Sequence, residues 1–301
     1  MRQQKFRPGG ALMISGVILL WFILTALSVV FVAVDIRSTP ESPVLKWGFV
    51  LVTAYTGPFG AFFYVLGCRE PLPGLHEKYV AARWRQVLGS TMHCVAGDGV
   101  GILAGAVIAG TLRLSAPLHT ALEYVLGFGF GWSIFQALFM RDMAGGSFTR
   151  ALRETFSSEF LSMNTLMAAM VPVARISMAR LPGSDSPHNP AFWFIMSLAL
   201  LSGAIFAYPM NWWLVSHHLK HGMMTIRKLP AMPEAPRESM SGMPSEAMPK
   251  RAEAMAGMSP QAMSHAAASK PSTGTIVAVG ALSLVLFAAG IIVSVIFTSP
   301  G

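Results

Sequence analysis

Long apolar runs, separated by short polar segments, follow one another along most of the chain. A helix of about 20 residues crosses the hydrocarbon core of a bilayer, which is about 30 Å thick. Runs of at least that length lie at about residues 11–34, 44–67, 87–112, 118–140, 156–179, 191–215 and 274–298. This pattern predicts an all-α, polytopic membrane helix bundle of about seven transmembrane helices, six forming a core and one C-terminal span added to it.

Two of these runs allow a second interpretation. The fifth run contains Glu159 and Asn164, so it is either a span that faces the bundle interior or an interfacial helix. The first run follows Arg2, Lys5 and Arg7 and resembles a signal peptide, but its apolar stretch is too long for one. We therefore interpret the first run as an uncleaved anchor.

Composition and charge support a membrane location and predict its orientation. Of the 301 residues, 53% are hydrophobic and 12% are charged, against about 25% charged in an average soluble domain. Cytoplasmic loops of membrane proteins collect Lys and Arg. With a cytoplasmic N-terminus, the basic residues left outside are Arg37, Lys46, Arg113, Arg175 and Arg180. The prediction is a cytoplasmic N-terminus, a periplasmic C-terminus and no nucleic-acid partner, because the basic residues sit at helix ends rather than in one patch.

The domain organisation follows from where the composition changes. Residues 1–80 form a two-span anchor region, and residues 81–228 form a four-span membrane domain. Residues 229–273 are rich in Met, Pro, Ala and Ser, and this composition predicts a disordered cytoplasmic linker. Residues 274–301 contain the last span.

The third apolar run carries three polar residues where lipid-facing residues are expected. These are His93, Cys94 and Asp98. An aspartate at the centre of a span costs about 2.5–3.5 kcal/mol, so it should face the bundle interior and have a partner. The three residues either fix helix packing through hydrogen bonds or form a functional site. Both cysteines of the chain, Cys68 and Cys94, fall near the predicted cytoplasmic side, where a structural disulfide is not expected.

Small residues accompany this polar cluster. Residues four apart share a face of a helix, so Gly97, Gly101 and Gly105 form one stripe with His93. Such a stripe lets a second helix approach closely. It predicts a helix-packing seam beside the polar residues.

The fifth run contributes a second set of candidate ligands. Glu159 enters the membrane at nearly the same depth as His93, which makes a shared site geometrically possible. Met163, Met167 and Met170 lie on one face above the carboxylate, where they either pack in the core or offer soft thioether ligands.

The end of the sixth run and the linker offer further ligands. His217 and His221 are four residues apart, so they can share one metal ion if the helix continues past the bilayer; alternatively, they complement the helix dipole. The linker repeats Met-x-x-Met in "MSGM" and "MAGM", a spacing that favours Cu(I) unless it is low-complexity filler. His119 and Glu123 lie at the opposite membrane face and are not included in the site.

Two stretches resemble a bacterial family of multi-pass proteins known as a domain of unknown function, DUF4396, and this resemblance implies a bacterial inner-membrane location. They are "WRQVLGSTMHCVAGDGVGILAG" at 84–105 and "PAFWFIMSLALLSGAIFAYPMNWWLVSHHLKHGM" at 190–223. The resemblance runs from about residue 80 to 225. It implies a membrane domain and singles out His93, Cys94, Asn211 and His221, but it implies no reaction.

Taken together, these features favour a membrane protein that binds or transports a transition-metal ion, with copper as the expected ion. The proposed metal ligands are His93, Cys94, Asp98, Glu159, Met163, Met167, His217 and His221. The alternative is a membrane scaffold or assembly factor that docks a partner membrane protein or a second copy through its glycine seams. An intramembrane redox enzyme is a third class, although the chain has no recognisable nucleophile and base pair, so a transporter is favoured over an enzyme.

Overall fold

The computed structural model describes residues 8–141, 146–222 and 271–299, and within these ranges it contains helices and no strands. The helices are α1 (Pro8–Asp35), α2 (Pro43–Thr56), α3 (Pro58–Gly67), α4 (His76–Val80), α5 (Arg83–Thr111), α6 (Ala116–Phe130), the π-helix η1 (Gly131–Gln136), α7 (Ala137–Arg141), α8 (Phe148–Arg180), α9 (Pro190–Ser216) and α12 (Thr273–Thr298). The predicted all-α membrane bundle is confirmed, although its count of seven spans is not. Most of the predicted linker lies outside the described residues.

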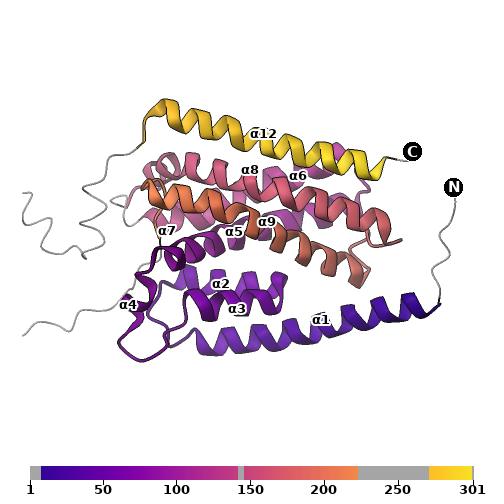
Figure 1. The fold of residues 1–301 in the computed structure, drawn as a ribbon, viewed down its shortest axis with the longest axis horizontal. Helices are drawn as coiled ribbons and strands as arrows, with labels where there is room; N and C mark the ends of the chain where they lie inside the picture. Colours follow the sequence, from indigo (N-terminus) through magenta and orange to yellow (C-terminus); the bar gives the residue numbers. More distant parts are fainter. Residues whose placement is uncertain (1–7, 142–145, 223–270, 300–301) are drawn as a thin grey trace, which may run out of the picture.

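Five helices are long and apolar enough to cross a membrane: α1, α5, α8, α9 and α12. The shortest of these segments has 23 residues, which is about 35 Å at about 1.5 Å per residue. These helices lie side by side along the long axis of the molecule (Figure 1). They fit a multi-pass integral membrane protein.

Polar residues start several of these helices and so help to set their ends. Ser147 and Asn189 each accept a hydrogen bond from a backbone N–H in the first turn, at the start of α8 and α9 respectively. Such N-caps satisfy amide groups that have no partner within the helix. The cap positions explain why α8 begins eight residues before its predicted span.

The fourth predicted span is a helix interrupted by a π-helical turn. Residues 118–140 fall within α6, η1 and α7, which follow one another without a break. A π-helix widens the turn and is frequent at functional sites. Here it lies beside the polar residues of α5.

The structure corrects the prediction of a second span at residues 44–67. The apolar run 44–67 does not cross the bundle but folds into a hairpin of two short helices, α2 and α3. The chain reverses at Gly57, whose φ of 63° suits glycine, and Pro58 begins the second helix. With 14 residues, α2 rises only about 21 Å.

Both ends of this hairpin lie at one end of the molecule. Asp35, at the end of α1, accepts hydrogen bonds from Tyr64 at 2.7 Å and from Arg69 at 2.9 Å. Glu41 precedes α2 and Cys68 follows α3, and these two side chains lie close together. The segment therefore enters and leaves on the same side, as a re-entrant hairpin.

The hairpin changes the predicted topology. Because it does not cross, α1 begins at the same end of the molecule at which α12 finishes (Figure 1). Seven crossings would instead place the start of α1 and the end of α12 at opposite ends of the molecule. We call the end of the molecule at which the hairpin enters and leaves, and at which Lys220 lies, the Lys220 end. We call the opposite end the Arg113 end.

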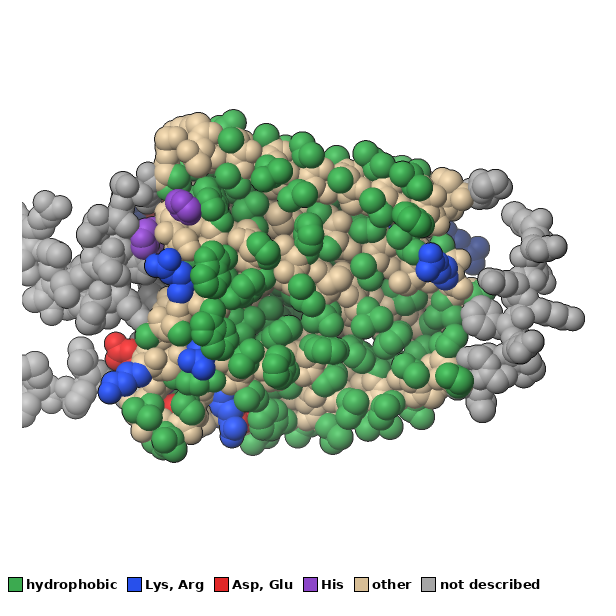
Figure 2. Space-filling model, in the orientation of Figure 1, with side chains coloured by type: hydrophobic (Ala, Val, Ile, Leu, Met, Phe, Trp, Pro, Cys, Tyr) green, Lys and Arg blue, Asp and Glu red, His purple; other side chains and the backbone are tan. Residues whose placement is uncertain are grey.

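Surface composition matches this axis. On the face shown, charged side chains gather at the two ends, histidines lie at the left end, and hydrophobic side chains cover the band between the ends (Figure 2). The most apolar surfaces belong to the two outer helices, whose exposed side chains include Leu19, Leu27, Val285 and Ile296. This band is the surface expected to contact lipid.

The C-terminal helix α12 packs against α8. Asn164 on α8 donates a hydrogen bond to Ser283 on α12 at 3.0 Å. Farther along, Gly290 lies directly on the backbone of Ala168, so closely that a side chain would not fit. Close backbone approach and interhelical hydrogen bonds are the usual means by which membrane helices associate.

Candidate intramembrane cation site

The glycine stripe of α5 packs against the chain's own α6 and η1. A Cβ added at Gly97 would lie 2.8 Å from the Cα of Gly131, and one added at Gly105 would lie 2.9 Å from the Cα of Glu123. At Gly101 it would overlap the backbone carbonyl of Leu126. The stripe therefore brings η1 within reach of the polar side chains of α5.

The π-helix η1 supplies polar contacts to this part of α5. The carbonyl oxygen of Phe135 lies 3.2 Å from Nε2 of His93. The side-chain amide of Gln136 donates to Sγ of Cys94 at 2.8 Å. The π-helical turn thus places a backbone acceptor and an amide beside the His-Cys pair.

Cys94 lies at the centre of a buried polar cluster. Its thiol is 3.4 Å from Oε2 of Glu159 on α8 and is fully buried. Lys220, from the segment after α9, also donates to Sγ of Cys94. The same ammonium donates to Oδ1 of Asn211 at 2.9 Å and lies 3.8 Å from Oε2 of Glu159.

A chain reversal after α9 carries Lys220 into the bundle. His218 has a φ of 56°, and the N–H of Leu219 bonds to the carbonyl of Leu214. This is the Schellman arrangement that ends a helix with a left-handed residue. Its accompanying hydrophobic contact is present as well, since Leu219 packs against the cluster that contains Leu214.

Asn211 is held in place by its own hydrogen bonds. Its Nδ2 donates to Oγ of Ser162 at 3.1 Å and to the carbonyl of Ala207 at 3.1 Å. These bonds leave its Oδ1 directed at Lys220. The asparagine singled out by the resemblance therefore positions the lysine.

Two buried carboxyl groups, those of Asp98 and Glu159, lie beside η1. Gly131 lies against both of them, because a Cβ at this position would overlap Oδ1 of Asp98 and lie 2.7 Å from Oε1 of Glu159. Both residues have no exposed surface. Neither oxygen of Asp98, nor Oε1 of Glu159, has a hydrogen-bond partner among the described residues. Two carboxyls therefore face one ammonium, and charge balance calls for one more proton or cation.

The predicted histidines occupy different places. His93 and His221 line one small cavity of about 20 Å³ together with Gln136, which is room for a single water molecule. His217 caps α9 and its Nδ1 lies 2.8 Å from the carbonyl of Trp213. Because α9 ends at Ser216, His217 and His221 do not share a helix face, and the condition for a shared metal ion is not met.

The two methionines of the predicted site lie in the core. Met163 and Met167 are fully buried and belong to the main hydrophobic cluster. The methyl group of Met163 fills the space over Gly127, where a Cβ would approach it to 2.7 Å. Their surroundings are those of packing residues.

A polar cavity opens at the Arg113 end. It has a volume of about 700 Å³, and His119, Glu123 and Arg175 contribute to its lining. Between this cavity and the Cys94 cluster, Tyr124 donates to Asn164 at 2.7 Å. Polar groups thus continue through the depth of the domain, and His119 and Glu123, which the sequence interpretation set aside, belong to that series.

Sequence reasoning missed Gln136 and Lys220. A glutamine within an apolar run gave no spacing signal, because its direction depends on the π-helical turn. A signal for Lys220 was present, since the resemblance included the Lys-His-Gly that ends the matched segment at residues 220–222. The position of Lys220 near a helix end is also typical of a basic residue at a membrane boundary, so the sequence alone does not place it in the site.

Comparison with known proteins adds one match. Residues 83–220 match the family model described as "Domain of unknown function (DUF4396)". Searches of curated proteins and of solved structures found no match. The matched range begins with α5 and ends at Lys220, so it contains every residue of the Cys94 cluster. The membrane domain that carries this cluster therefore belongs to the DUF4396 family.

Proposed function

We propose that this domain transports a cation across the bilayer and that the Lys220 ammonium occupies the cation site in the state described here. The observation that carries the proposal is the set of acceptors around Nζ of Lys220. These are Sγ of Cys94, Oδ1 of Asn211 and, at 3.8 Å, Oε2 of Glu159. A cation that replaced the ammonium would meet the same sulfur and oxygen atoms.

The position of Lys220 in a short segment after α9 favours a side chain that can move out of the cation site. Lys220 lies four residues beyond the end of α9, so its side chain moves with a short segment and not with a spanning helix. An incoming cation and the ammonium would compete for one carboxylate. Such competition lets one site alternate between a closed state filled by lysine and a loaded state filled by cargo.

Copper is the first cargo to examine. A thiol is a soft ligand that favours Cu(I), whereas carboxylate and amide oxygens are harder ligands. Cys94 offers the thiol, and the unpartnered oxygens of Asp98 and Glu159 offer negative charge. Met163 and Met167 keep the packing role given by their surroundings and are not part of the proposed site.

Orientation follows from the basic residues at the two ends. At the Lys220 end, beside the helix ends that lie there, are Arg37, Lys46, Arg69, Lys78, Arg83, Arg85, Arg150, Arg153 and Lys220. The Arg113 end has Arg113, Arg175 and Arg180 among the described residues. Because basic residues collect on the cytoplasmic side, we propose that the Lys220 end is cytoplasmic and that α1 begins and α12 finishes outside. This would place the DUF4396 site within reach of the cytoplasm.

The scaffold alternative receives less support. It relied on the glycine stripe as a docking face for another membrane protein. In the structure Gly97, Gly101 and Gly105 are covered by α6 and η1. A partner would have to use another surface.

Binding of Ag(I), a redox-inert substitute for Cu(I), to the purified full-length protein tests the proposal. Wild type should bind Ag(I), and Lys220→Met should bind it about tenfold more tightly or better, because the competing ammonium is gone. Glu159→Gln and Cys94→Ser should each weaken binding by at least tenfold. Cys68→Ser is the matched control, since this second buried cysteine lies outside the cluster, and it should leave the affinity of the Cys94 site unchanged.

Two results would contradict cation transport at this site. One is an Ag(I) affinity that does not change in Cys94→Ser and Glu159→Gln. The other is a Lys220→Met protein that is folded by size-exclusion chromatography but binds no more tightly than wild type. Uptake of Ag(I) into proteoliposomes separates transport from binding alone. Wild type should take up Ag(I), and Glu159→Gln should abolish this uptake.

A second candidate function is proton conduction. The specific observation in its favour is the pair of carboxyls beside Gly131, which faces a single ammonium. Proton relays in membrane proteins use such intramembrane carboxyls. Proteoliposomes with a pH-sensitive dye distinguish it: a proton flux without added metal that Asp98→Asn abolishes would favour this candidate over metal transport.

A further inference from the structure

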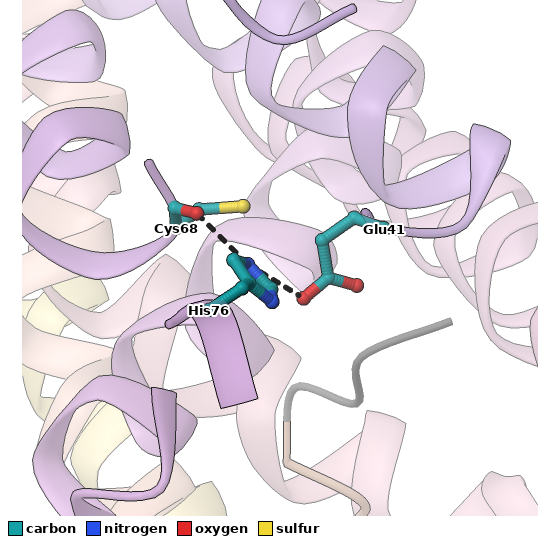
Figure 3. Close-up of side chains that lie close together, drawn as sticks. All are labelled: Glu41, Cys68 and His76. Atoms are coloured by element: carbon teal, nitrogen blue, oxygen red, sulfur yellow. Dashed lines mark hydrogen bonds and ion pairs between the residues drawn. The ribbon is translucent and has the colours of Figure 1, made fainter. Parts of the chain in front are cut away.

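A second cluster of candidate ligands lies outside the DUF4396 domain, at the base of the re-entrant hairpin. Glu41, Cys68 and His76 each offer one ligand atom, and these atoms lie within 4.8 Å of one another. Among the described residues, this is the group of three His, Cys, Asp or Glu side chains that meets that distance. Their side chains converge from three separate segments (Figure 3).

Each residue comes from a different part of the local fold. Glu41 lies in the loop before α2, Cys68 follows the last residue of α3, and His76 is the first residue of α4. The hairpin alone brings the first two together. The cluster thus joins the entry and the exit of the hairpin to the next helix.

The three side chains are almost completely removed from the surface. Cys68 and His76 have no exposed surface, and Glu41 is 6% exposed. Within the part of the chain that the structure describes, Oε1 of Glu41 has no hydrogen-bond partner, and it lies 3.6 Å from Nε2 of His76. Nε2 of His76 also lies 3.0 Å from the carbonyl oxygen of Cys68.

Charge around Glu41 is poorly compensated. Lys46 acts on this carboxyl only at longer range, and its Nζ donates to the carbonyl of Arg37 at 3.0 Å. Burial raises the pKa of Glu41 to about 8, and burial also raises the pKa of the Cys68 thiol. A metal ion bound among these three side chains would supply positive charge to the buried carboxyl and thiol.

We propose that Glu41, Cys68 and His76 bind a zinc ion that fastens the two ends of the re-entrant hairpin to α4. Thiolate, imidazole and carboxylate are the ligand types that Zn²⁺ uses in proteins. In a tetrahedral zinc site, ligand atoms lie about 3.5 Å apart, so the cluster needs to contract by about 1 Å at most. A water molecule completes four-coordination.

Binding changes the protonation of the ligands. The thiol and the carboxyl bind as anions and the imidazole binds neutral, so zinc binding releases protons to solvent. No electron transfer is involved. The site is distinct from the proposed cation site, because it is built from three other residues, all of which precede the DUF4396 match.

Zinc content of the full-length protein, purified in detergent after growth with added Zn²⁺, tests this proposal. We expect about one zinc per chain in wild type. Loss of an outer-shell partner of a metal ligand costs 10–100-fold in affinity, so Cys68→Ser and His76→Gln should each cost about 100-fold or more. Cys94→Ser is the matched control and should retain zinc.

A second measurement guards against variants that fail to fold. Wild-type protein is stripped with a chelator and reloaded with Co²⁺ alone. The expected result is tetrahedral Co²⁺ absorption with a thiolate charge-transfer band, together with an unfolding midpoint raised by metal. A stripped wild type that neither binds Co²⁺ nor changes its midpoint would overturn the proposal, as would zinc that remains in both folded ligand variants. Failure here leaves the Ag(I) result at Cys94 unaffected.

Discussion

Lys220 donates a hydrogen bond to Cys94 across 126 positions of the chain. The contact links the turn after α9 to the buried polar face of α5. It also brings a single cation to two buried carboxyls, those of Glu159 and Asp98. The pair therefore ties the fold of the DUF4396 domain to the charge balance of its interior.

Replacing the lysine should destabilise the protein in the absence of a cation. Lys220→Met leaves Glu159 buried without its ion-pair partner, and removing one partner of a buried pair costs about 3–5 kcal/mol. The unfolding midpoint in detergent should fall markedly, and added Ag(I) should restore part of it. The double variant Lys220→Met/Glu159→Gln should be more stable than the single one.

The exposed ion pair of Arg150 and Glu154 provides the control for this prediction. Its side chains are 68% and 51% exposed, so Arg150→Ala should change stability by less than about 1 kcal/mol. If Lys220→Met and Arg150→Ala unfold at the same midpoint, the buried contact between Lys220 and Glu159 does not contribute to stability.

The helical membrane architecture could be predicted from the sequence because five of the predicted runs fall on long apolar helices. The polar face of α5 was also predictable, since an aspartate in a span must face the interior. Glu159 was expected near the depth of His93, and the structure puts its carboxylate 3.4 Å from the neighbouring thiol of Cys94. These inferences depend on periodicity within a helix.

The parts that were missed depend on where the chain reverses. The run 44–67 is as apolar as a span, and Gly57-Pro58 within it is also compatible with a kinked transmembrane helix. The bonds of Asp35, which precedes the hairpin, to Tyr64 and Arg69 at its exit distinguish the two. Glu41, Cys68 and His76 were not predicted to form a group, because a chain reversal brings them together and no helix periodicity connects them.

The contact between α8 and α12 makes a testable contribution to stability. Ser283→Ala removes the acceptor of Asn164 Nδ2, which leaves a buried amide hydrogen without its partner. Interhelical hydrogen bonds in membranes average about 0.6 kcal/mol and reach about 1.7 kcal/mol. We expect a loss in this range by thermal unfolding in detergent.

Ser294 on the same helix is the matched control. Its hydroxyl donates within α12, to the carbonyl of Ile291. Ser294→Ala should therefore have a smaller effect than Ser283→Ala. Equal effects would mean that the bond to Asn164 does not contribute to docking of α12.

The glycine stripe should tolerate no side chain at its tightest position. A Cβ at Gly101 overlaps the carbonyl of Leu126, which is backbone and cannot move aside without shifting α6. Gly101→Ala should cost about 1–3 kcal/mol by overpacking. Gly129→Ala is the control, since nothing lies within 4 Å of a Cβ there, and it should be neutral or mildly stabilising in the same thermal assay.

The re-entrant hairpin predicts which residues share a side of the membrane. Ser38 and Glu77 flank the hairpin and are exposed, and both should lie on the side of Arg150. Arg113 and Asp185 line the cavity at the other end and should lie opposite. Single cysteines at these positions, in a Cys68→Ser/Cys94→Ser background that retains folding, can be labelled with a membrane-impermeant maleimide in spheroplasts and in inside-out vesicles.

A spanning segment at 44–67 gives a different labelling pattern. It would place Ser38→Cys and Glu77→Cys on opposite sides, because the chain would cross once between them. The hairpin requires the same side for both, since Asp35 before it binds Arg69 after it. Given the basic residues at the Lys220 end, both cysteines should react in inside-out vesicles while Arg113→Cys reacts in spheroplasts. Reaction of Ser38→Cys and Glu77→Cys from opposite sides would rule out the hairpin, and reaction of both in spheroplasts would keep the hairpin but reverse the proposed orientation.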